Sequence, residues 1–132
     1  MRFMLDTNIC IELIRGRGAK ALRRLRRCRV GEVGISAITL AELEHGVEKS
    51  AKPEQNRLAL HLFCAPIEVL PFDDAASVAY GQVRSRLERA GEVIGPMDLL
   101  IAAHALAERA ALVTNNEREF RRVEGLRVQN WL

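Results

Sequence analysis

The sequence predicts a single α/β domain in which helices cover both faces of a parallel sheet. Short apolar runs such as "RFML" and "VGIS" alternate with amphipathic stretches that are too long to be hairpin loops. Long helical connections between strands favour parallel pairing and a sheet buried on both faces. The 132 residues fit one domain with one core, so we assign residues 1–132 to a single unit.

Five apolar runs predict the strands. Each is short, rich in aliphatic residues and bounded by a turn or by a helix-start signal. The fourth run continues into a predicted turn at its polar end. In chain order the predicted strands cover residues 2–5, 33–36, 67–72, 111–116 and 126–131.

Six helices are predicted between these strands. Apolar residues recur in them at helical spacing, as in "AITLAELEHGVEKS". Asp6, Ser36 and Asp73 precede three of the helices as N-caps, and Pro53 and Pro96 stand in first turns, where proline is tolerated. In chain order the predicted helices cover residues 7–16, 19–28, 37–50, 53–65, 74–91 and 95–110.

The composition is that of a globular protein away from membranes. Apolar residues make up 48% and charged residues 28% of the chain. No apolar run approaches the ~20 residues that a bilayer span needs, and the N-terminus lacks the pattern of a secretory signal. We therefore expect a cytoplasmic protein. The three cysteines are odd in number and far apart, which favours free buried thiols over disulfides or a zinc site.

Basic charge is concentrated in arginine. The net charge is +3, and 17 of the 20 basic residues are arginine. A run of charge is commonly a solvated helix face, but arginine also suits bidentate contact with phosphate or carboxylate. For the run "RRLRRCR", a solvated helix face and contact with a nucleic acid or an acidic protein partner are therefore equally good explanations. Its arginines are Arg23, Arg24, Arg26, Arg27 and Arg29.

Acidic residues follow several of the predicted strands. Asp6 ends the first strand, Glu42 lies in the helix after the second, and Asp98 lies in the first turn of the helix at 95–110. Asn116 and Glu119 follow the fourth strand. Because function in open parallel sheets gathers beyond the carboxyl ends of the strands, these side chains are candidates for one site.

Each acidic residue also has an ordinary structural explanation. Taken alone, Asp6 is better explained as a helix cap, and Asp98 complements a helix macrodipole. However, Glu42 and Asp98 are both flanked by apolar residues, which is unusual for surface charges. Grouped carboxylates repel one another unless a hard cation such as Mg²⁺ or Mn²⁺ neutralises them. The pattern therefore indicates a Mg²⁺-dependent phosphodiesterase acting on a nucleic acid held by arginines.

Four segments together resemble a known family. "MLDTN", "SAITLAELEHGVEKS", "IGPMDLLIAAHAL" and "LVTNNEREFRRVEGLRVQNW" occur in the order found in PIN-domain ribonucleases, and within these in the VapC toxins of type II toxin–antitoxin pairs. The resemblance implies a three-layer α/β/α sandwich around a parallel sheet of about five strands. It also implies Mg²⁺- or Mn²⁺-dependent cleavage of RNA, with the anticodon stem-loop of initiator tRNA as the leading substrate.

The resemblance further implies partners. It implies a small antitoxin that wraps the toxin and blocks its site, contact with DNA only through that antitoxin, and a homodimer.

The matched motifs also assign residues. Asp6, Glu42 and Asp98 correspond to the acidic, metal-binding core, and Thr7 and Asn8 of "DTN" to supporting residues. By this resemblance Asp6 and Asp98 hold the metal, and Glu42 holds it or orients the attacking water. Attack in line on phosphorus would leave a 5′-phosphate and a 3′-hydroxyl.

The last motif departs from the family pattern. Thr114 matches a supporting position, but the fourth acidic position is Asn116, which carries no charge. Glu119, one helical turn later, is the better candidate for the fourth carboxylate and metal ligand. An asparagine can still offer its carbonyl oxygen to a metal or to a metal-bound water. The substitution leaves open whether one metal or two is bound.

Other function classes fit less well. A haloacid-dehalogenase-type phosphatase needs an aspartate where Asn8 stands, and a receiver domain needs a lysine late in the chain, where none occurs. Glu42 and His45 form one Glu-x-x-His motif, whereas a di-metal helical bundle needs two. No nucleophile motif of a serine hydrolase is present. The main alternative is a non-catalytic PIN-fold module that binds RNA or protein, which Asn116 leaves room for.

Overall fold

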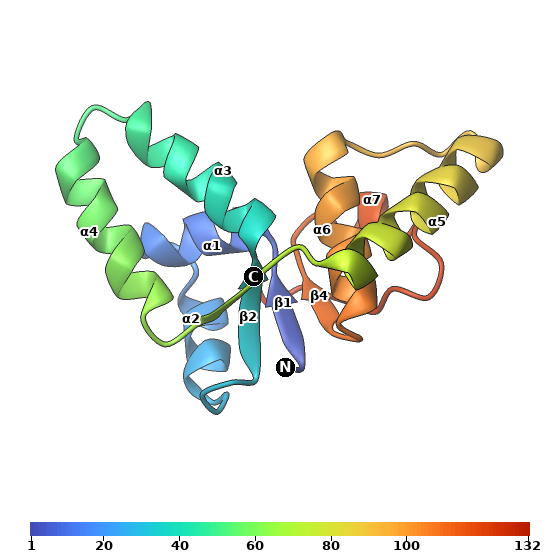
Figure 1. Ribbon diagram of the computed structural model, residues 1–132. Helices are drawn as coiled ribbons and strands as arrows, with labels where there is room; N and C mark the ends of the chain where they lie inside the picture. The colour runs from blue at the N-terminus through green and yellow to red at the C-terminus, as the bar shows by residue number, and fades with distance from the viewer.

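The computed structural model describes residues 1–132, which form five strands and seven helices. Figure 1 shows the central strands between two groups of helices. The strands are β1 (Phe3–Leu5), β2 (Val33–Ser36), β3 (Glu68–Leu70), β4 (Ala111–Val113) and β5 (Val128–Gln129). The helices are α1 (Thr7–Ile14), α2 (Ala19–Arg26), α3 (Ala37–Glu48), α4 (Pro53–Cys64), α5 (Asp74–Ala90), α6 (Pro96–Ala107) and α7 (Glu117–Phe120).

All strand pairs in the sheet are parallel, as predicted. The strand order is β3-β2-β1-β4-β5, with β1 at the centre between β2 and β4. The chain therefore builds the sheet outward from β1 in two directions, and the carboxyl ends of all strands face the same edge. Asp6 and Thr114 stand directly beyond the ends of the two neighbouring strands β1 and β4.

Alternating side chains of the strands bury a core on each face of the sheet. Phe3 and Leu5 pack with α1 to α4, whereas Met4 between them points to the opposite face and packs with α5 and α6. Leu112 of β4 joins the second core, and its neighbours Ala111 and Val113 join the first. Each layer thus covers one face, and the predicted three-layer α/β/α sandwich is confirmed.

The predicted caps are present. Asp6 Oδ1 accepts a hydrogen bond from the backbone N–H of Ile9 at 2.9 Å, and Ser36 and Asp73 accept equivalent bonds at the starts of α3 and α5. Gly91 ends α5 with a φ of 68°, a conformation that favours glycine. Local side-chain chemistry therefore determines where these helices begin and end.

No element was predicted at residues 117–120, where the chain forms the short helix α7. The strand predicted at residues 111–116 is also shorter than expected, because β4 ends at Val113. A single turn is too short to show helical periodicity, and Asn116, which precedes it, makes no side-chain capping bond. Its buried residue Phe120 joins the second core, so packing against the rest of the molecule stabilises this turn.

The burial of the cysteines and the hydropathy of the helices were both predicted from the composition, and the structure tests each. Cys10 is buried, Cys28 and Cys64 are half-buried, and all three are free thiols. The expectation of buried thiols is therefore fully met only by Cys10. None of the helices combines the length and the hydropathy needed to cross a lipid bilayer.

Candidate active site at the carboxyl edge of the sheet

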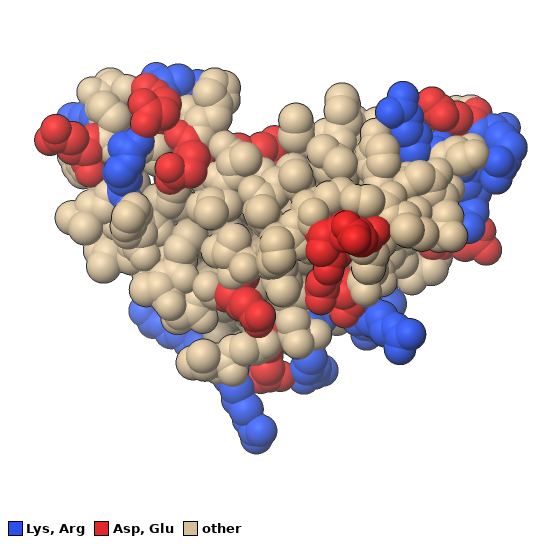
Figure 2. Space-filling view, in the orientation of Figure 1, with Lys and Arg blue, Asp and Glu red and all other residues tan.

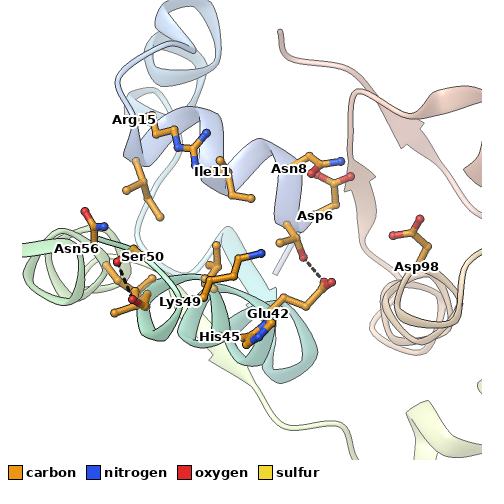
Figure 3. A pocket seen from close by; sticks show the side chains of 16 residues that line it. Asp6, Asn8, Ile11, Arg15, Glu42, His45, Lys49, Ser50, Asn56 and Asp98 are labelled. Atoms are coloured by element: carbon orange, nitrogen blue, oxygen red, sulfur yellow. Dashed lines mark hydrogen bonds between the residues drawn. The ribbon is translucent and has the colours of Figure 1, made fainter. Parts of the chain in front are cut away.

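Three of the predicted acidic residues meet in one pocket. Asp6 from the end of β1, Glu42 from α3 and Asp98 from α6 all contribute to its lining, together with Thr7 and Asn8. Figure 3 shows Asp6 and Asp98 on opposite sides of the opening, with Glu42 below them. In the space-filling view the molecule is hollowed at the top, between the arm formed by α3 and α4 and the pair α5 and α6 (Figure 2). The sequence order strand–Asp, helix–Glu, helix–Asp thus becomes one cluster in space.

Asp6 is held from two directions. It is only 3% exposed, its Oδ1 accepts the cap bond from Ile9, and the side chain of Thr114, directly beyond β4, lies near it. Burial raises the pKa of Asp6, while the Thr114 side chain and the bond from Ile9 lower it and the negative charge of Glu42 raises it again. The cap bond and the place in the site are therefore two roles of the same carboxylate.

Glu42 is oriented by Thr7. The Thr7 hydroxyl donates to Glu42 Oε1 at 2.6 Å, which is much shorter than the 3.3 Å from the same oxygen to Thr39 Oγ1. Since the hydroxyl has one proton, the bond to Glu42 is the dominant one. It joins the first residue of α1 to the middle of α3 and leaves Oε2 of Glu42 free for another ligand. Thr7 thus orients Glu42, and its role in support of catalysis stays a prediction.

Glu119 lies beside Asp98, although it does not line the pocket itself. A Cβ placed on Gly95 would be 3.6 Å from Asp98 Oδ2 and 3.7 Å from Glu119 Oε1, so both carboxylates flank the same point. The Gly95 backbone N–H donates to Glu119 Oε1 at 2.8 Å. The sequence did not indicate this contact, because it joins residues 24 positions apart.

Asn116 binds Glu119. Its side-chain Nδ2 donates to Glu119 Oε2 at 2.5 Å, and its backbone N–H donates to Thr114 Oγ1 at 2.9 Å. Where the family pattern often has a fourth carboxylate, this chain therefore has an amide that holds the carboxylate of Glu119 in place. Thr114 connects this turn to Asp6.

The carboxylates affect one another strongly. The pKa of Asp98 rises from 3.8 to about 7, first because the group is partly buried. The charges of Glu119 and Asp6, a hydrogen bond with Glu119 and the charge of Glu42 raise it further. The site thus holds more negative charge than it accommodates at neutral pH without a counter-charge.

This donor set fits a hard divalent cation. All the candidate ligands are oxygen atoms, and a 2+ ion would remove the repulsion that raises the pKa of Asp98. As the side chains stand, no group of three His, Cys, Asp or Glu side chains is close enough to coordinate one ion. Mg²⁺ retains several water ligands, so carboxylates on opposite sides of the pocket can hold it through those waters without all binding it directly.

A buried histidine connects the two helices that carry Glu42 and Asp98. His104 of α6 is fully buried, and its Nδ1 lies 2.7 Å from Ser36 Oγ, the cap of α3. Burial lowers the pKa of His104, so its ring is neutral in the folded protein at pH 7. His104 is a structural histidine, whereas His45 lies exposed along the pocket.

The arginine run of α2 lies outside this pocket. None of Arg23, Arg24, Arg26 or Arg27 lines it. Arg24 packs over the Trp131 and Phe3 rings at 5.1 and 5.9 Å and donates to Gln129. Arg24 thus has structural contacts, and the other arginines of the run form no ion pair. Their contact with RNA or antitoxin stays a prediction.

Replacing Asn116 with aspartate should destabilise the metal-free protein at pH 8. The variant Asn116→Asp loses the donor to Glu119 and gains a like charge beside it, which we expect to cost about 1–2 kcal/mol of unfolding free energy. Urea denaturation in EDTA measures this. The loss should shrink at pH 5, where carboxylates take up protons, and on addition of Mn²⁺. The same change at exposed Asn130 is the control, and an equal effect there would contradict the role of Asn116.

Comparison with known proteins shows the family of this chain. The family model described as "PIN domain" matches residues 3–126. The tRNA(fMet)-specific endonuclease VapC of Shigella flexneri is 45% identical over 99% of this chain and 98% of its own length. VapC in the structure of DNA-bound VapBC from Salmonella typhimurium is 41% identical with a TM-score of 0.94, covering 100% of this chain and 99% of that one. The structure of VapBC2 from Rickettsia felis bound to a promoter DNA fragment superposes with a TM-score of 0.91 at 42% identity, over the full length of both chains. The chain therefore belongs to the PIN-domain family and, within it, to the VapC ribonucleases.

Proposed function

We propose that this protein is the toxin of a type II toxin–antitoxin pair and cleaves RNA with the help of Mg²⁺ or Mn²⁺. The observation that carries the proposal is the convergence of Asp6, Glu42 and Asp98 on one pocket at the carboxyl edge of the sheet. These residues come from three separate elements. Hydrogen bonds hold Asp6 and Glu42, and the negative charges of both raise the pKa of Asp98. A carboxylate that only caps a helix would not need two further carboxylates in the same pocket.

The cation would be held by Asp6, Asp98, Glu42 and Glu119, directly or through water. When bound, such an ion lowers the pKa of water and offsets the charge that develops on the phosphate oxygens. The protein's own part is orientation. Glu42, fixed by Thr7, has Oε2 free to accept a hydrogen bond from the attacking water. The water oxygen bonds to phosphorus, the bond to O3′ breaks, and that oxygen takes up a proton to give a 3′-hydroxyl and a 5′-phosphate.

We propose tRNA as the substrate, with the anticodon stem-loop of initiator tRNA as the first choice. The relative from Shigella flexneri is named a tRNA(fMet)-specific endonuclease and matches this chain almost from end to end. Single-stranded loops are the parts of an RNA that can enter a hollowed site, because their bases are free of the helix.

The proposed protein partner is a small antitoxin. The solved VapBC relatives from Salmonella typhimurium and Rickettsia felis are described as bound to DNA. By analogy, the antitoxin would block the acidic pocket of this chain and make the contact with promoter DNA. We expect the toxin itself to form a homodimer.

The test is to incubate the purified protein with total bacterial tRNA and to sequence the new RNA ends. We expect cuts in one anticodon stem-loop, with 5′-phosphate ends, in Mg²⁺ or Mn²⁺ and none in EDTA. Glu42→Gln should remove cleavage, whereas Glu44→Gln on the same helix should keep it, since Glu44 lies outside the acidic pocket. Cuts in another RNA would change only the substrate. No cleavage of any cellular RNA with either metal would favour the non-catalytic binding module.

A further inference from the structure

The acidic pocket continues into a groove with a different character. The cavity, about 560 Å³, runs from Asp6 and Asp98 between α1, α3 and α4 to Arg15, and Lys49 extends into it from α3 (Figure 3). This volume is within the ~300–1,000 Å³ range of ligand-binding pockets. The far end also carries the polar side chain of Asn56 from α4. One end of a single groove is therefore acidic, and the other is basic.

Arg15 and Lys49 have no charged partner. Neither takes part in an ion pair or in a side-chain hydrogen bond, whereas six other arginines each pair with a carboxylate. Both stand at the ends of helices, Arg15 as the C-cap of α1 and Lys49 as the C-cap of α3, where a cation is favourable. The helix dipole accounts for a basic residue at each place. It does not account for two unpaired cations directed into the same groove from different helices.

The backbones of the two cations lie along their helices from the acidic end. At 1.5 Å per residue, the Cα of Arg15 is roughly 13 Å along α1 from that of Asp6, and the Cα of Lys49 is roughly 10 Å along α3 from that of Glu42. Neither side chain pairs with a carboxylate of the site. Arg15 and Lys49 are therefore available to another anion.

We propose that Arg15 and Lys49 form a subsite for a second phosphate of the RNA strand whose scissile phosphate lies at the acidic end. This inference rests on the proposed function. A single strand laid along the groove places one phosphate at the acidic end and a further phosphate at the two cations. Arginine and lysine are the side chains that hold backbone phosphates in this way.

The floor between the two ends suits a nucleotide held without selection of its base. It is largely aliphatic, with Ile11, Ile14 and Leu43 among its residues. No Phe, Tyr or Trp lines the groove, and His45 supplies its one ring. The groove therefore suits contact with the sugar–phosphate backbone, which fixes the register of the strand.

The test compares two double variants with the same loss of charge. Arg15→Gln/Lys49→Gln removes the subsite, and Arg89→Gln/Lys52→Gln removes two exposed cations outside the groove. Binding of a fluorescent oligouridylate is measured in EDTA over a range of salt concentrations. Loss of this one phosphate contact should flatten the slope of log affinity against log salt by roughly 0.7 relative to the control pair. In the cleavage assay, KM should rise about tenfold in the subsite variant, with kcat within about twofold of wild type.

Two results would overturn the proposal. The first is a salt slope and a KM equal to those of the control pair. The second is unchanged RNA binding together with weakened binding of the antitoxin, which would assign the groove to a protein segment. The binding measurement needs no metal and no turnover. Absence of cleavage by the wild-type protein would therefore refute the proposed function, while the salt slope would still decide the subsite.

Discussion

Asp6→Asn should abolish RNA cleavage, by about a thousandfold or more, and leave the fold intact. Asparagine is as good an N-cap as aspartate, so its side-chain oxygen can keep the bond to the Ile9 N–H. The change removes one negative charge from a group that is 3% exposed, which relieves repulsion rather than adding strain. For the proposed metal site, loss of one ligand charge at the reacting centre corresponds to about 4 kcal/mol or more of transition-state stabilisation. Initial cleavage rates and circular dichroism measure the two properties separately.

The control for this change is Asp73→Asn at the start of α5. Asp73 makes the same kind of cap bond, to the Ala76 N–H at 3.0 Å, but lies outside the acidic pocket. It should retain full cleavage. Asp6→Ala should lose both roles, with cleavage absent and unfolding free energy lower by about 1 kcal/mol. Full activity of Asp6→Asn would remove Asp6 from the site and leave it only as a cap.

The parts of the fold that follow from local chemistry were predictable from the sequence. A cap residue, a proline in a first turn or a glycine after a helix acts on its neighbours, so Asp6, Pro53 and Gly91 indicated helix boundaries correctly to within about two residues. The parallel pairing followed from long helical connections. The order of strands in the sheet did not follow, because it depends on which strands pack across residues far apart in the chain.

The candidate site shows the same division. Asp6, Glu42 and Asp98 were identified because each follows a strand or is embedded in apolar sequence. Which groups orient them was not identifiable, since Thr7 meets Glu42 across 35 positions and Gly95 meets Glu119 across 24. Such contacts are made by the packing of helices and leave no mark on local sequence.

Basic residues show why neighbours in sequence are a poor guide to neighbours in space. The arginine run at 23–29 attracted attention because its charges are consecutive, yet Arg24 is occupied by two aromatic rings. Arg15 and Lys49 attracted none, because 34 positions separate them in the chain. They reach one groove only because α1 and α3 lie side by side (Figure 3).

Asp98→Asn should make the metal-free protein more stable at pH 8. The folded-state pKa of Asp98 is raised from 3.8 to about 7, so the folded protein holds a proton that the unfolded chain has released over this range. The favourable contribution is complete below pH 3.8 and is lost as the pH rises through about 7. Asparagine mimics the protonated form at every pH. Because Asp98 is only partly buried, we expect a gain of roughly 2–3 kcal/mol at pH 8, less than the full linkage value.

A divalent metal ion should make the wild-type protein more stable than Asp98→Asn. A cation that binds only the folded wild-type protein raises its unfolding free energy by mass action, and Asp98→Asn should gain far less because a ligand is missing. Urea denaturation at pH 8 in EDTA and in Mn²⁺ should therefore show the variant as the more stable protein without metal and the less stable one with it. At pH 5 without metal the difference should be less than half of that at pH 8, and it should vanish below about pH 3.8.

Asp74→Asn distinguishes this effect from an ordinary helix charge. Asp74 and Asp98 both lie in the first turn of a helix, where a negative charge is favourable, but Asp74 is exposed and outside the pocket. Its replacement should lower stability by a few tenths of a kcal/mol and should not change the response to Mn²⁺. The two substitutions are thus expected to change the unfolding free energy in opposite directions in EDTA at pH 8. If Asp98→Asn also destabilised the protein there, the charge of Asp98 would serve the helix dipole and its repulsion by Asp6 and Glu119 would be disproved.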